Sequence, residues 1–226
     1  MLTIDSLYKT YGTKLVLKNI NQSFERGIIH GIVGENGAGK TTLFRCLADL
    51  ETYQGKIQYD LAGPRKDKTG YLTTHPYFLS RITGLEYIQL LLNARNISIK
   101  EITAHNIFDL PLDQYAATYS TGMKKKLALT AILLQKNDLF LLDEPFNGMD
   151  IQSNILFKEV LFKLKEMGKL ILLSSHIFAA LGETCDVLHH LKDGIIVRSV
   201  PKESFHLIET AMKNQVFKKK IEELPL

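Results

Sequence analysis

The sequence satisfies the pattern G-x-x-x-x-G-K-[ST] at Gly34-Glu35-Asn36-Gly37-Ala38-Gly39-Lys40-Thr41. This loop follows a short apolar run, Ile28–Val33, and precedes a predicted helix, which is the context in which the pattern binds phosphate. Gly37 and Gly39 lack the side chains that would block several backbone N–H groups from converging on one anion. A helix beginning at Lys40 adds its N-terminal dipole. We therefore predict a site for the phosphate chain of a nucleoside triphosphate.

Three polar side chains close this loop. Lys40 supplies a mobile positive charge for the outer phosphates, and the Thr41 hydroxyl has the size and hardness to ligate Mg²⁺. Thr42 adds a further hydroxyl donor. The alternative interpretation is a glycine turn that happens to carry a lysine, and the strand and helix on either side argue against it.

A second candidate group lies where the apolar segment Leu139–Leu142 ends in Asp143 and Glu144, followed by Pro145. In open parallel sheets, ligands bind at this carboxyl edge. Side chains alternate along a strand, so the two acids cannot have the same role. We assign Asp143 to Mg²⁺ and Glu144 to orienting or deprotonating the attacking water. The alternative is a pair of exposed acids that begin a turn at Pro145.

These residues need a scaffold, and a chain of 226 residues can bury a substantial core. A composition of 45% hydrophobic and 23% charged residues excludes collagen, coiled coil and a wholly disordered chain. Cys46 and Cys185 lack disulfide or metal-ligand spacing, which favours a reducing compartment. Met1–Thr10 lacks the apolar segment of a signal peptide, and no apolar run reaches the roughly 20 residues that cross a bilayer.

The apolar runs at 28–33, 139–142 and 170–173 are typical of strands buried on both faces of an α/β sheet. Partial alternation near the start predicts an antiparallel pair of strands, 2–7 and 15–24. Helical spacing and turn signals predict the remaining elements, which are helices at 85–96, 124–135, 151–167 and 178–183 and strands at 187–191 and 195–200.

Taken in order, these segments resemble the ATP-binding cassette (ABC) family, specifically the nucleotide-binding subunit of an ABC transporter, over nearly the whole chain. The resemblance implies an α/β fold with a P-loop NTPase core in a single domain, 1–226. It also implies an N-terminal antiparallel β-subdomain at roughly 1–30 and an α-helical subdomain inserted at roughly 75–135. The implied activity is Mg-dependent ATP hydrolysis coupled to transport, with ATP and Mg²⁺ as cofactors.

Two further segments match the family by their place in the sequence. Tyr8–Gly12 resembles the family's aromatic loop before the phosphate loop, which makes Tyr11 the candidate for stacking on adenine. Without the family, a tyrosine beside a turn would be interpreted as ordinary packing. Tyr119–Met123 lies where the family carries its Leu-Ser-Gly-Gly-Gln signature and keeps Ser120 and Gly122. Without the family, Ser120 would be read as a helix N-cap.

Two segments after the acidic pair also resemble the family. His176 follows an apolar strand, like the switch histidine that contacts the γ-phosphate and helps to hold the attacking water. Asp150, in Gly148-Met149-Asp150, resembles the aspartate that crosses the dimer interface. Without the family, a lone histidine after a strand would be interpreted as a structural residue. The assignments of His176 and Asp150 therefore both depend on where these residues lie in the order of the motifs.

Two features depart from the simplest expectation. Thr74 stands where the family normally has a glutamine, and because threonine is shorter, we expect His75 or a water molecule to substitute in metal contact. Lys124-Lys125-Lys126 follows the signature directly, and we expect a solvated helix face there, unless an anion or an acidic partner lies near. Lys218-Lys219-Lys220 could touch a lipid headgroup surface.

The resemblance implies two subunits, as a homodimer or a heterodimer, with each ATP between the phosphate loop of one and the signature of the other. It further implies integral-membrane permease subunits and a cytoplasmic location, peripheral to the membrane.

The alternative is a soluble ABC-type ATPase that acts on nucleic acid, ribosomes or an assembly scaffold. With no Trp and a net charge of +4, a nucleic-acid partner is not expected. A module that binds ATP without turnover is a further alternative, and Glu144 argues against it.

Overall fold

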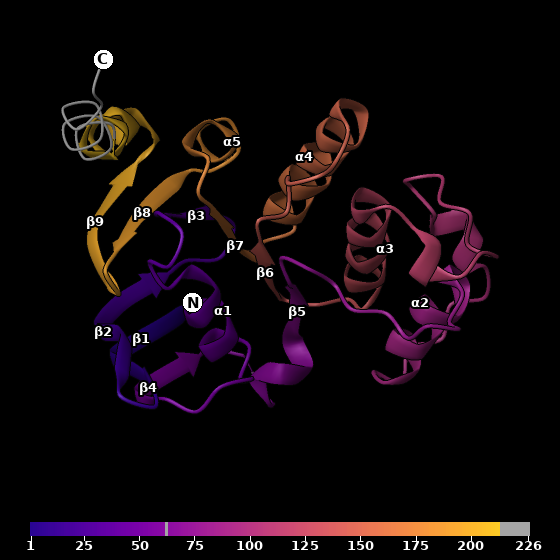
Figure 1. Ribbon diagram of the computed structural model, residues 1–226, viewed down its shortest axis with the longest axis horizontal. Helices are drawn as coiled ribbons and strands as arrows, with labels where there is room; N and C mark the ends of the chain where they lie inside the picture. The colour runs from indigo at the N-terminus through magenta and orange to yellow at the C-terminus, as the bar shows by residue number, and fades with distance from the viewer. Residues whose placement is uncertain (62, 213–226) are drawn as a thin grey trace, which may run out of the picture.

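The computed structural model describes residues 1–61 and 63–212, which form two sheets (Figure 1). One sheet is antiparallel, with the strand order β2 (Lys14–Phe24), β1 (Leu2–Tyr11) and β4 (Gln54–Tyr59). The other has the order β5 (Thr69–Leu72), β6 (Leu139–Asp143), β7 (Leu170–Ser175), β3 (Ile29–Val33), β8 (Val187–Lys192) and β9 (Ile195–Pro201). Its strands run parallel except for β9, which pairs antiparallel with β8. The predicted α/β fold class is confirmed.

Two cores lie on opposite faces of the six-stranded sheet. One contains α1 (Lys40–Leu47) and the antiparallel sheet, and the other contains α3 (Thr121–Leu134), α4 (Ile151–Glu166) and α5 (Phe178–Gly182) (Figure 1). Strand β6 contributes to both, because Leu139 and Leu141 pack with the first core whereas Phe140 and Leu142 pack with the second. Successive side chains of a strand point to opposite faces, so a strand between two cores must be apolar throughout.

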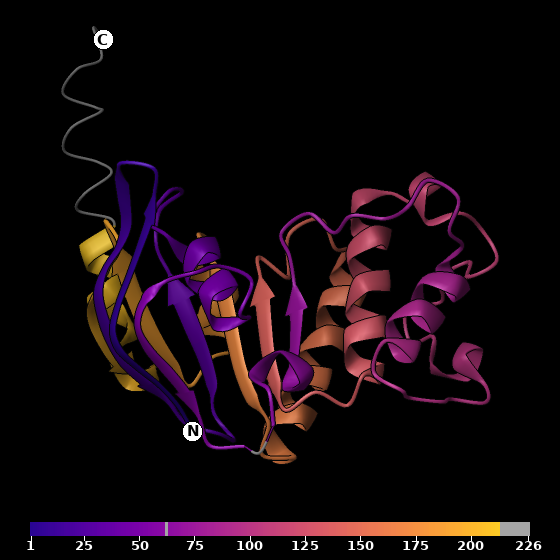
Figure 2. The ribbon, with the colours of Figure 1, turned by 90° about the horizontal axis from the view of Figure 1, so that it is seen from below.

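A helical region extends to one side of the parallel sheet (Figure 2). It contains α2 (Gly84–Asn93), α3 and two short 3₁₀ turns, η2 (Ile102–His105) and η3 (Ala116–Thr118). Helix α2 begins with a capping box, in which Thr83 and Glu86 exchange side-chain to backbone hydrogen bonds. Helix α3 begins earlier than the predicted Lys124, because the Ser120 hydroxyl accepts a hydrogen bond from the Met123 N–H (3.2 Å) and caps the helix.

The N-terminal sheet is larger than residues 1–30, because β4 pairs with β1 in antiparallel register, with Ile4 opposite Ile57. Gly55, at φ +100°, lies so close to β1 that a Cβ there would be 2.2 Å from the Ser6 carbonyl oxygen. Two 3₁₀ turns complete the described elements, η1 (Arg65–Lys68) and η4 (Lys202–Ser204), and residues 205–212 are helical. The run Lys218-Lys219-Lys220 lies outside the described residues.

Within residues 1–61 and 63–212, no helix combines the length and the apolar character that crossing a membrane requires.

A buried pair of histidines, on the neighbouring strands β3 and β8, begins a hydrogen-bond chain that reaches the antiparallel sheet. The Glu25 N–H donates to His30 Nε2 (3.1 Å), His30 Nδ1 lies 3.2 Å from His189 Nε2, and His189 Nδ1 lies 2.8 Å from Ser199 Oγ. The Ser199 hydroxyl donates to Gln22 Oε1 (3.1 Å). Since Ser199 gives its own proton to Gln22, it accepts from His189 Nδ1–H, and His189 Nε2 then accepts from His30 Nδ1–H. His30 Nε2 also lies 3.1 Å from the Glu25 carbonyl oxygen, so the two rings, Ser199 and the backbone of Glu25 form one continuous hydrogen-bond chain.

This pair predicts a loss of stability in acid. Burial lowers the pKa of both histidines, that of His189 to about 3. Below an unfolded-state pKa of about 6.5 the unfolded chain binds more protons than the folded one, so stability is greatest above that pH and falls as the pH drops towards 3. For His189 we expect the free energy of unfolding in urea to fall by about 1–2 kcal/mol between about pH 6.5 and 5, and His30 should add to the fall in the same direction.

The variant His189→Gln is expected to show a shallower pH slope, and His206→Gln, at an exposed position, is expected to keep the slope of the parent protein. Equal slopes for the His189→Gln variant and the parent would show that the buried pair is not the source.

Candidate nucleotide site

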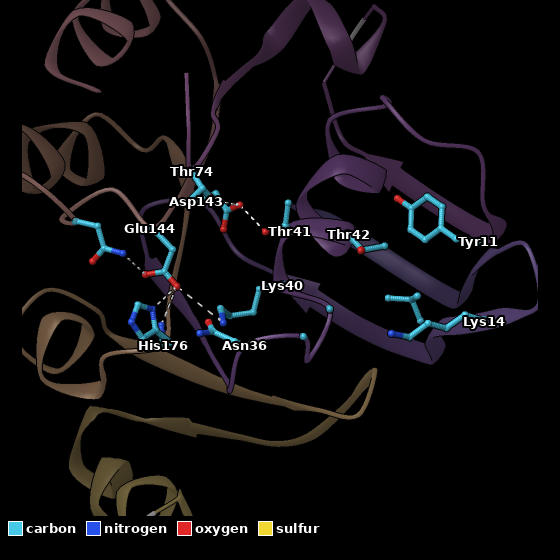
Figure 3. A pocket seen from close by; sticks show the side chains of 14 residues that line it. Tyr11, Lys14, Asn36, Lys40, Thr41, Thr42, Thr74, Asp143, Glu144 and His176 are labelled. Atoms are coloured by element: carbon cyan, nitrogen blue, oxygen red, sulfur yellow. Dashed lines mark hydrogen bonds and ion pairs between the residues drawn. The ribbon is translucent and has the colours of Figure 1, made fainter. Parts of the chain in front are cut away.

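A cleft of about 450 Å³ lies at the carboxyl ends of β3, β6 and β7, beside the start of α1 (Figure 3). Its walls come from the β1–β2 hairpin, the loop after β3, α1 and the loops after β5, β6 and β7. The lining residues are Tyr11, Lys14, Val16, Asn36, Gly37, Gly39, Lys40, Thr41, Thr42, Thr74, Asp143, Glu144, Asn147 and His176. The structure thus brings the predicted phosphate loop and the predicted acids to one place.

The loop between β3 and α1 curls tightly because Gly37 and Gly39 have positive φ angles of 84° and 109°. At Gly34 the constraint is space, since a Cβ there would lie 2.2 Å from the Leu191 carbonyl oxygen. Gly39 is the N-cap of α1, and no side chain caps the first N–H groups of this helix. These groups are the donors that an anion at a helix N-terminus uses.

Lys40 extends from the first turn of α1 into the cleft, and its side chain is 7% exposed. Its Nζ donates to the carbonyl oxygens of Gly34 (2.7 Å) and Glu35 (3.2 Å) and lies 3.8 Å from Glu144 Oε1. Burial lowers the pKa of Lys40, and the nearby carboxylates of Glu144 and Asp143 oppose that shift. The ammonium group therefore lies between the phosphate loop and the acids (Figure 3).

The Asp143 carboxylate is fully buried and accepts hydrogen bonds from three hydroxyls. Thr41 Oγ1 (2.7 Å) and Thr74 Oγ1 (2.8 Å) both donate to Oδ2, and Ser174 Oγ donates to Oδ1. Thr74 thus reaches Asp143, because the loop after β5 passes close to the end of β6, whereas the expectation about its reach to a metal ion stays a prediction. His75, the expected substitute, is exposed.

Glu144 is held at both carboxylate oxygens. Oε1 accepts from the backbone N–H of His176 (2.9 Å) and lies 2.8 Å from its ring Nδ1. Oε2 accepts from the Ser175 hydroxyl (3.1 Å) and the Asn147 amide (3.3 Å). Strand β6 ends at Asp143, and Glu144 has a positive φ of 50°. Because the alternation of a strand no longer applies there, both acids face the same cleft.

Tyr11 lines the cleft from the end of β1, and its side chain is 41% exposed. The Lys9 ammonium lies 4.6 Å from the centre of its ring and is itself paired with Glu51 at 3.0 Å. A cation–π contact with Lys9 thus stabilises the position of the Tyr11 ring.

Ser120, Gly122 and Asp150 do not line this cleft in the part of the chain that the structure describes. Ser120 caps α3, and Asp150 caps α4 by accepting from the Ser153 N–H at 2.8 Å. Hydrogen bonds from Ser153 and from Lys126 hold the pKa of the Asp150 carboxyl well below its usual range. Gly122 lies against the loop before α4, where an added Cβ would be 2.2 Å from the Gly148 carbonyl oxygen. The three residues therefore lie together where α3 and α4 begin, with Ser120 and Asp150 exposed and Gly122 buried.

Several residues that line the cleft or contact Glu144 were not predicted from the sequence. Lys14 could have been found, because the tight β1–β2 hairpin pairs it directly with Tyr11. Asn147 and Ser175 have no comparable signal, since their contacts with Glu144 depend on how two loops meet. The prediction of a solvated face at 124–126 is wrong for Lys125, whose side chain is 1% exposed.

A sequence profile of the ABC transporter family matches residues 17–147. The lantibiotic transport ATP-binding protein SrtF of Streptococcus pyogenes is 26% identical over 227 aligned positions, covering 96% of this chain and 97% of SrtF. A solved structure of an ATP-binding subunit of an ABC transporter has a TM-score of 0.84 and 26% identity, covering 95% of this chain and 99% of that one.

A dimeric ATP-binding cassette solved in a post-hydrolysis state with ADP and Pi has a TM-score of 0.80 and 22% identity, covering 89% of this chain and 99% of that one. At that identity the likeness shows the fold alone.

The profile match spans more than half of the chain and includes the phosphate loop and both acids. The near full-length likeness to ATP-binding subunits agrees with it. The chain belongs to the ABC transporter family, as an ATP-binding subunit that hydrolyses ATP to energise transport.

Proposed function

We propose that the chain works in pairs, with a second copy or a different cassette opposite it. Each ATP then lies between the phosphate loop of one subunit and Ser120 and Gly122 of the other, with Asp150 at the contact between them. Two observations support this arrangement. The phosphate loop and the start of α3 present separate surfaces in one chain, and a cassette of the same fold has been solved as a dimer with ADP and Pi.

The observation that carries the catalytic part of the proposal is the approach of Lys40 Nζ to Glu144 Oε1, at 3.8 Å in a shared cleft. A cation for the outer phosphates thus lies beside a carboxylate that is fixed by four other donors. Phosphoryl transfer depends on positioning and on charge stabilisation, and both are present here.

The donors around Asp143 suit Mg²⁺, which prefers carboxylate, hydroxyl and phosphate oxygens. Thr41 and Asp143 would hold the ion. The Thr41 hydroxyl donates its hydrogen bond to Asp143 Oδ2, so the lone pairs of Thr41 Oγ1 remain available to the metal. Thr74 donates to the same Oδ2 and fixes the orientation of the carboxylate. When bound, Mg²⁺ neutralises charge on the phosphate oxygens.

The remaining steps belong to the residues of this chain. The N–H groups of the phosphate loop and Lys40 bind the phosphates, and Tyr11 stacks on the adenine. Glu144 accepts a proton from water as the water oxygen bonds to the γ-phosphorus and the bond to the leaving ADP oxygen breaks. His176 holds Glu144 Oε1 and contacts the γ-phosphate. The products are ADP and inorganic phosphate.

The paired arrangement also explains how hydrolysis does work. The γ-phosphate supplies contacts that close the pair, and hydrolysis removes them, so ATP and ADP favour different states. We propose that the helical region, 75–135, passes this change to integral-membrane permease subunits, with the chain at the cytoplasmic face of the membrane. Recovery of the tagged chain with a polytopic membrane protein would support this; recovery with nucleic acid or a soluble scaffold would contradict it.

The pairing itself is testable in solution. The Glu144→Gln variant with ATP and Mg²⁺ is expected to sediment as a dimer, because the γ-phosphate stays in place, and as a monomer with ADP. Adding Ser120→Glu to this variant is expected to prevent the dimer, since it sets a carboxylate against the phosphates of the partner's ATP. Thr103→Glu, in which the same change is made at an exposed position, is the control and should leave the dimer intact. A monomer in every nucleotide state would contradict the shared site.

A further inference from the structure

Lys125 is a cation enclosed in the protein. It lies near the start of α3, its side chain is 1% exposed, and its Nζ donates to the Glu144 backbone oxygen at 2.6 Å. Burial lowers its pKa, and the carboxylates of Glu144 and Asp143 oppose that shift. A buried charge is costly unless it is hydrogen-bonded, so this contact must offset the loss of water around the ammonium.

The neighbouring lysine holds the other end of the same loop. Lys126 Nζ lies 3.1 Å from Asp150 Oδ2 and 3.2 Å from Ser153 Oγ, at the start of α4. Between these two contacts, Gly122 of α3 packs directly against the carbonyl of Gly148. The loop 144–150 is therefore fastened to the first turns of α3 at both ends and in its middle.

The backbone at Glu144 needs such support. Its φ of 50° lies in the left-handed region, which non-glycine residues rarely occupy and hold only when their surroundings impose it. Its N–H donates to the Ser174 carbonyl (3.1 Å), and its carbonyl oxygen accepts from Lys125 and, at 3.3 Å, from the Asn147 N–H. The direction of the Glu144 side chain follows from this backbone conformation.

We propose that Lys125 is a positioning residue for Glu144: its ammonium group fixes the backbone at the catalytic carboxylate and fastens that residue to the start of α3. Lys125 would touch neither the nucleotide nor the attacking water and would act only through Glu144.

The consequence is a connection between two sites, and this step rests on the proposed function. Helix α3 begins beside Ser120 and Gly122, which in a pair would contact the partner's ATP. Because Lys125 lies on the same first turns, a shift of α3 on contact with that ATP moves the Glu144 backbone of its own chain. The base of one site is thereby sensitive to the occupancy of the other.

The test compares Lys125→Met, which removes the donor and the charge, with Lys125→Arg, which keeps both, in the full-length chain. We expect Lys125→Met to lower kcat by about 10- to 100-fold while the Kd for ATP changes by less than about twofold, because a small displacement of a catalytic group slows chemistry without weakening binding. Lys125→Arg should keep most of the kcat of the parent protein. Lys124→Met, at the adjacent half-buried lysine, should match the parent protein.

A second readout needs no ATPase activity. In the nucleotide-free protein, the amides of 144–150 are expected to exchange hydrogen faster in Lys125→Met, but not in Lys125→Arg or Lys124→Met. Should Lys125→Met fail to fold, Lys125→Gln, which keeps a donor without the charge, takes its place in both measurements.

Unchanged kcat and unchanged exchange in Lys125→Met would overturn the proposal, as would a joint loss of kcat and ATP affinity that arginine does not restore. An inactive parent protein would refute the proposed function instead, and the exchange comparison would still decide the role of Lys125.

Discussion

Replacing Glu144 with Gln is expected to slow ATP hydrolysis by roughly a hundredfold or more while ATP binding stays intact, because the change removes the positioned base. Glutamine keeps the size of the side chain and can still accept from the His176 N–H, which donates to Glu144 Oε1 at 2.9 Å in the parent protein. The site should therefore keep its shape and lose only its proton acceptor. Single-turnover hydrolysis and ATP titration measure the two effects separately.

Glu159→Gln is the matched control for this prediction, because Glu159 is an exposed acid on α4. It should hydrolyse ATP at the rate of the parent protein. Unchanged turnover in Glu144→Gln would show that another group takes the proton, and the assignment of Glu144 would then be wrong.

Lys40→Ala is expected to act on binding. Lys40 lies at the start of α1, and removing its charge-assisted contacts with the phosphates should cost about 1.5–3 kcal/mol, which is roughly a 10- to 100-fold rise in the Kd for ATP. The carbonyl oxygens of Gly34 and Glu35 also lose their donor, so a melting curve must accompany the titration.

Lys56→Ala, at an exposed position on β4, controls for the loss of one positive charge far from the site. It should leave the Kd unchanged. Parental affinity in Lys40→Ala would contradict the role of this lysine in holding the phosphates.

The parallel sheet was predictable because strands such as β6 lie between two cores and must be apolar on both faces. Strand β4 had no such signal. Its sequence, Gln54–Tyr59, is mostly polar and mostly exposed, and what places it in the sheet is pairing with β1, some fifty residues earlier in the chain. Such long-range pairing leaves little trace in local sequence patterns.

The candidate site likewise combines features that local sequence patterns reveal with contacts that only the fold creates. The phosphate loop is predictable because its chemistry depends on residues that are adjacent in the sequence. The contacts of Thr74 with Asp143, and of Lys125 with Glu144, join residues from different loops and helices. Three consecutive lysines are usually solvated, and only the close approach of α3 to the end of β6 buries the middle one.

A crystal structure of the Glu144→Gln variant grown with ATP and Mg²⁺ would test the nucleotide site most directly. We expect the phosphates to lie against the N–H groups of the Gly34–Thr42 loop and Lys40, the ion to lie beside Thr41 and Asp143, and position 144 to face the γ-phosphate. A vacant cleft under saturating nucleotide, or ATP bound away from both acidic positions, would contradict this arrangement.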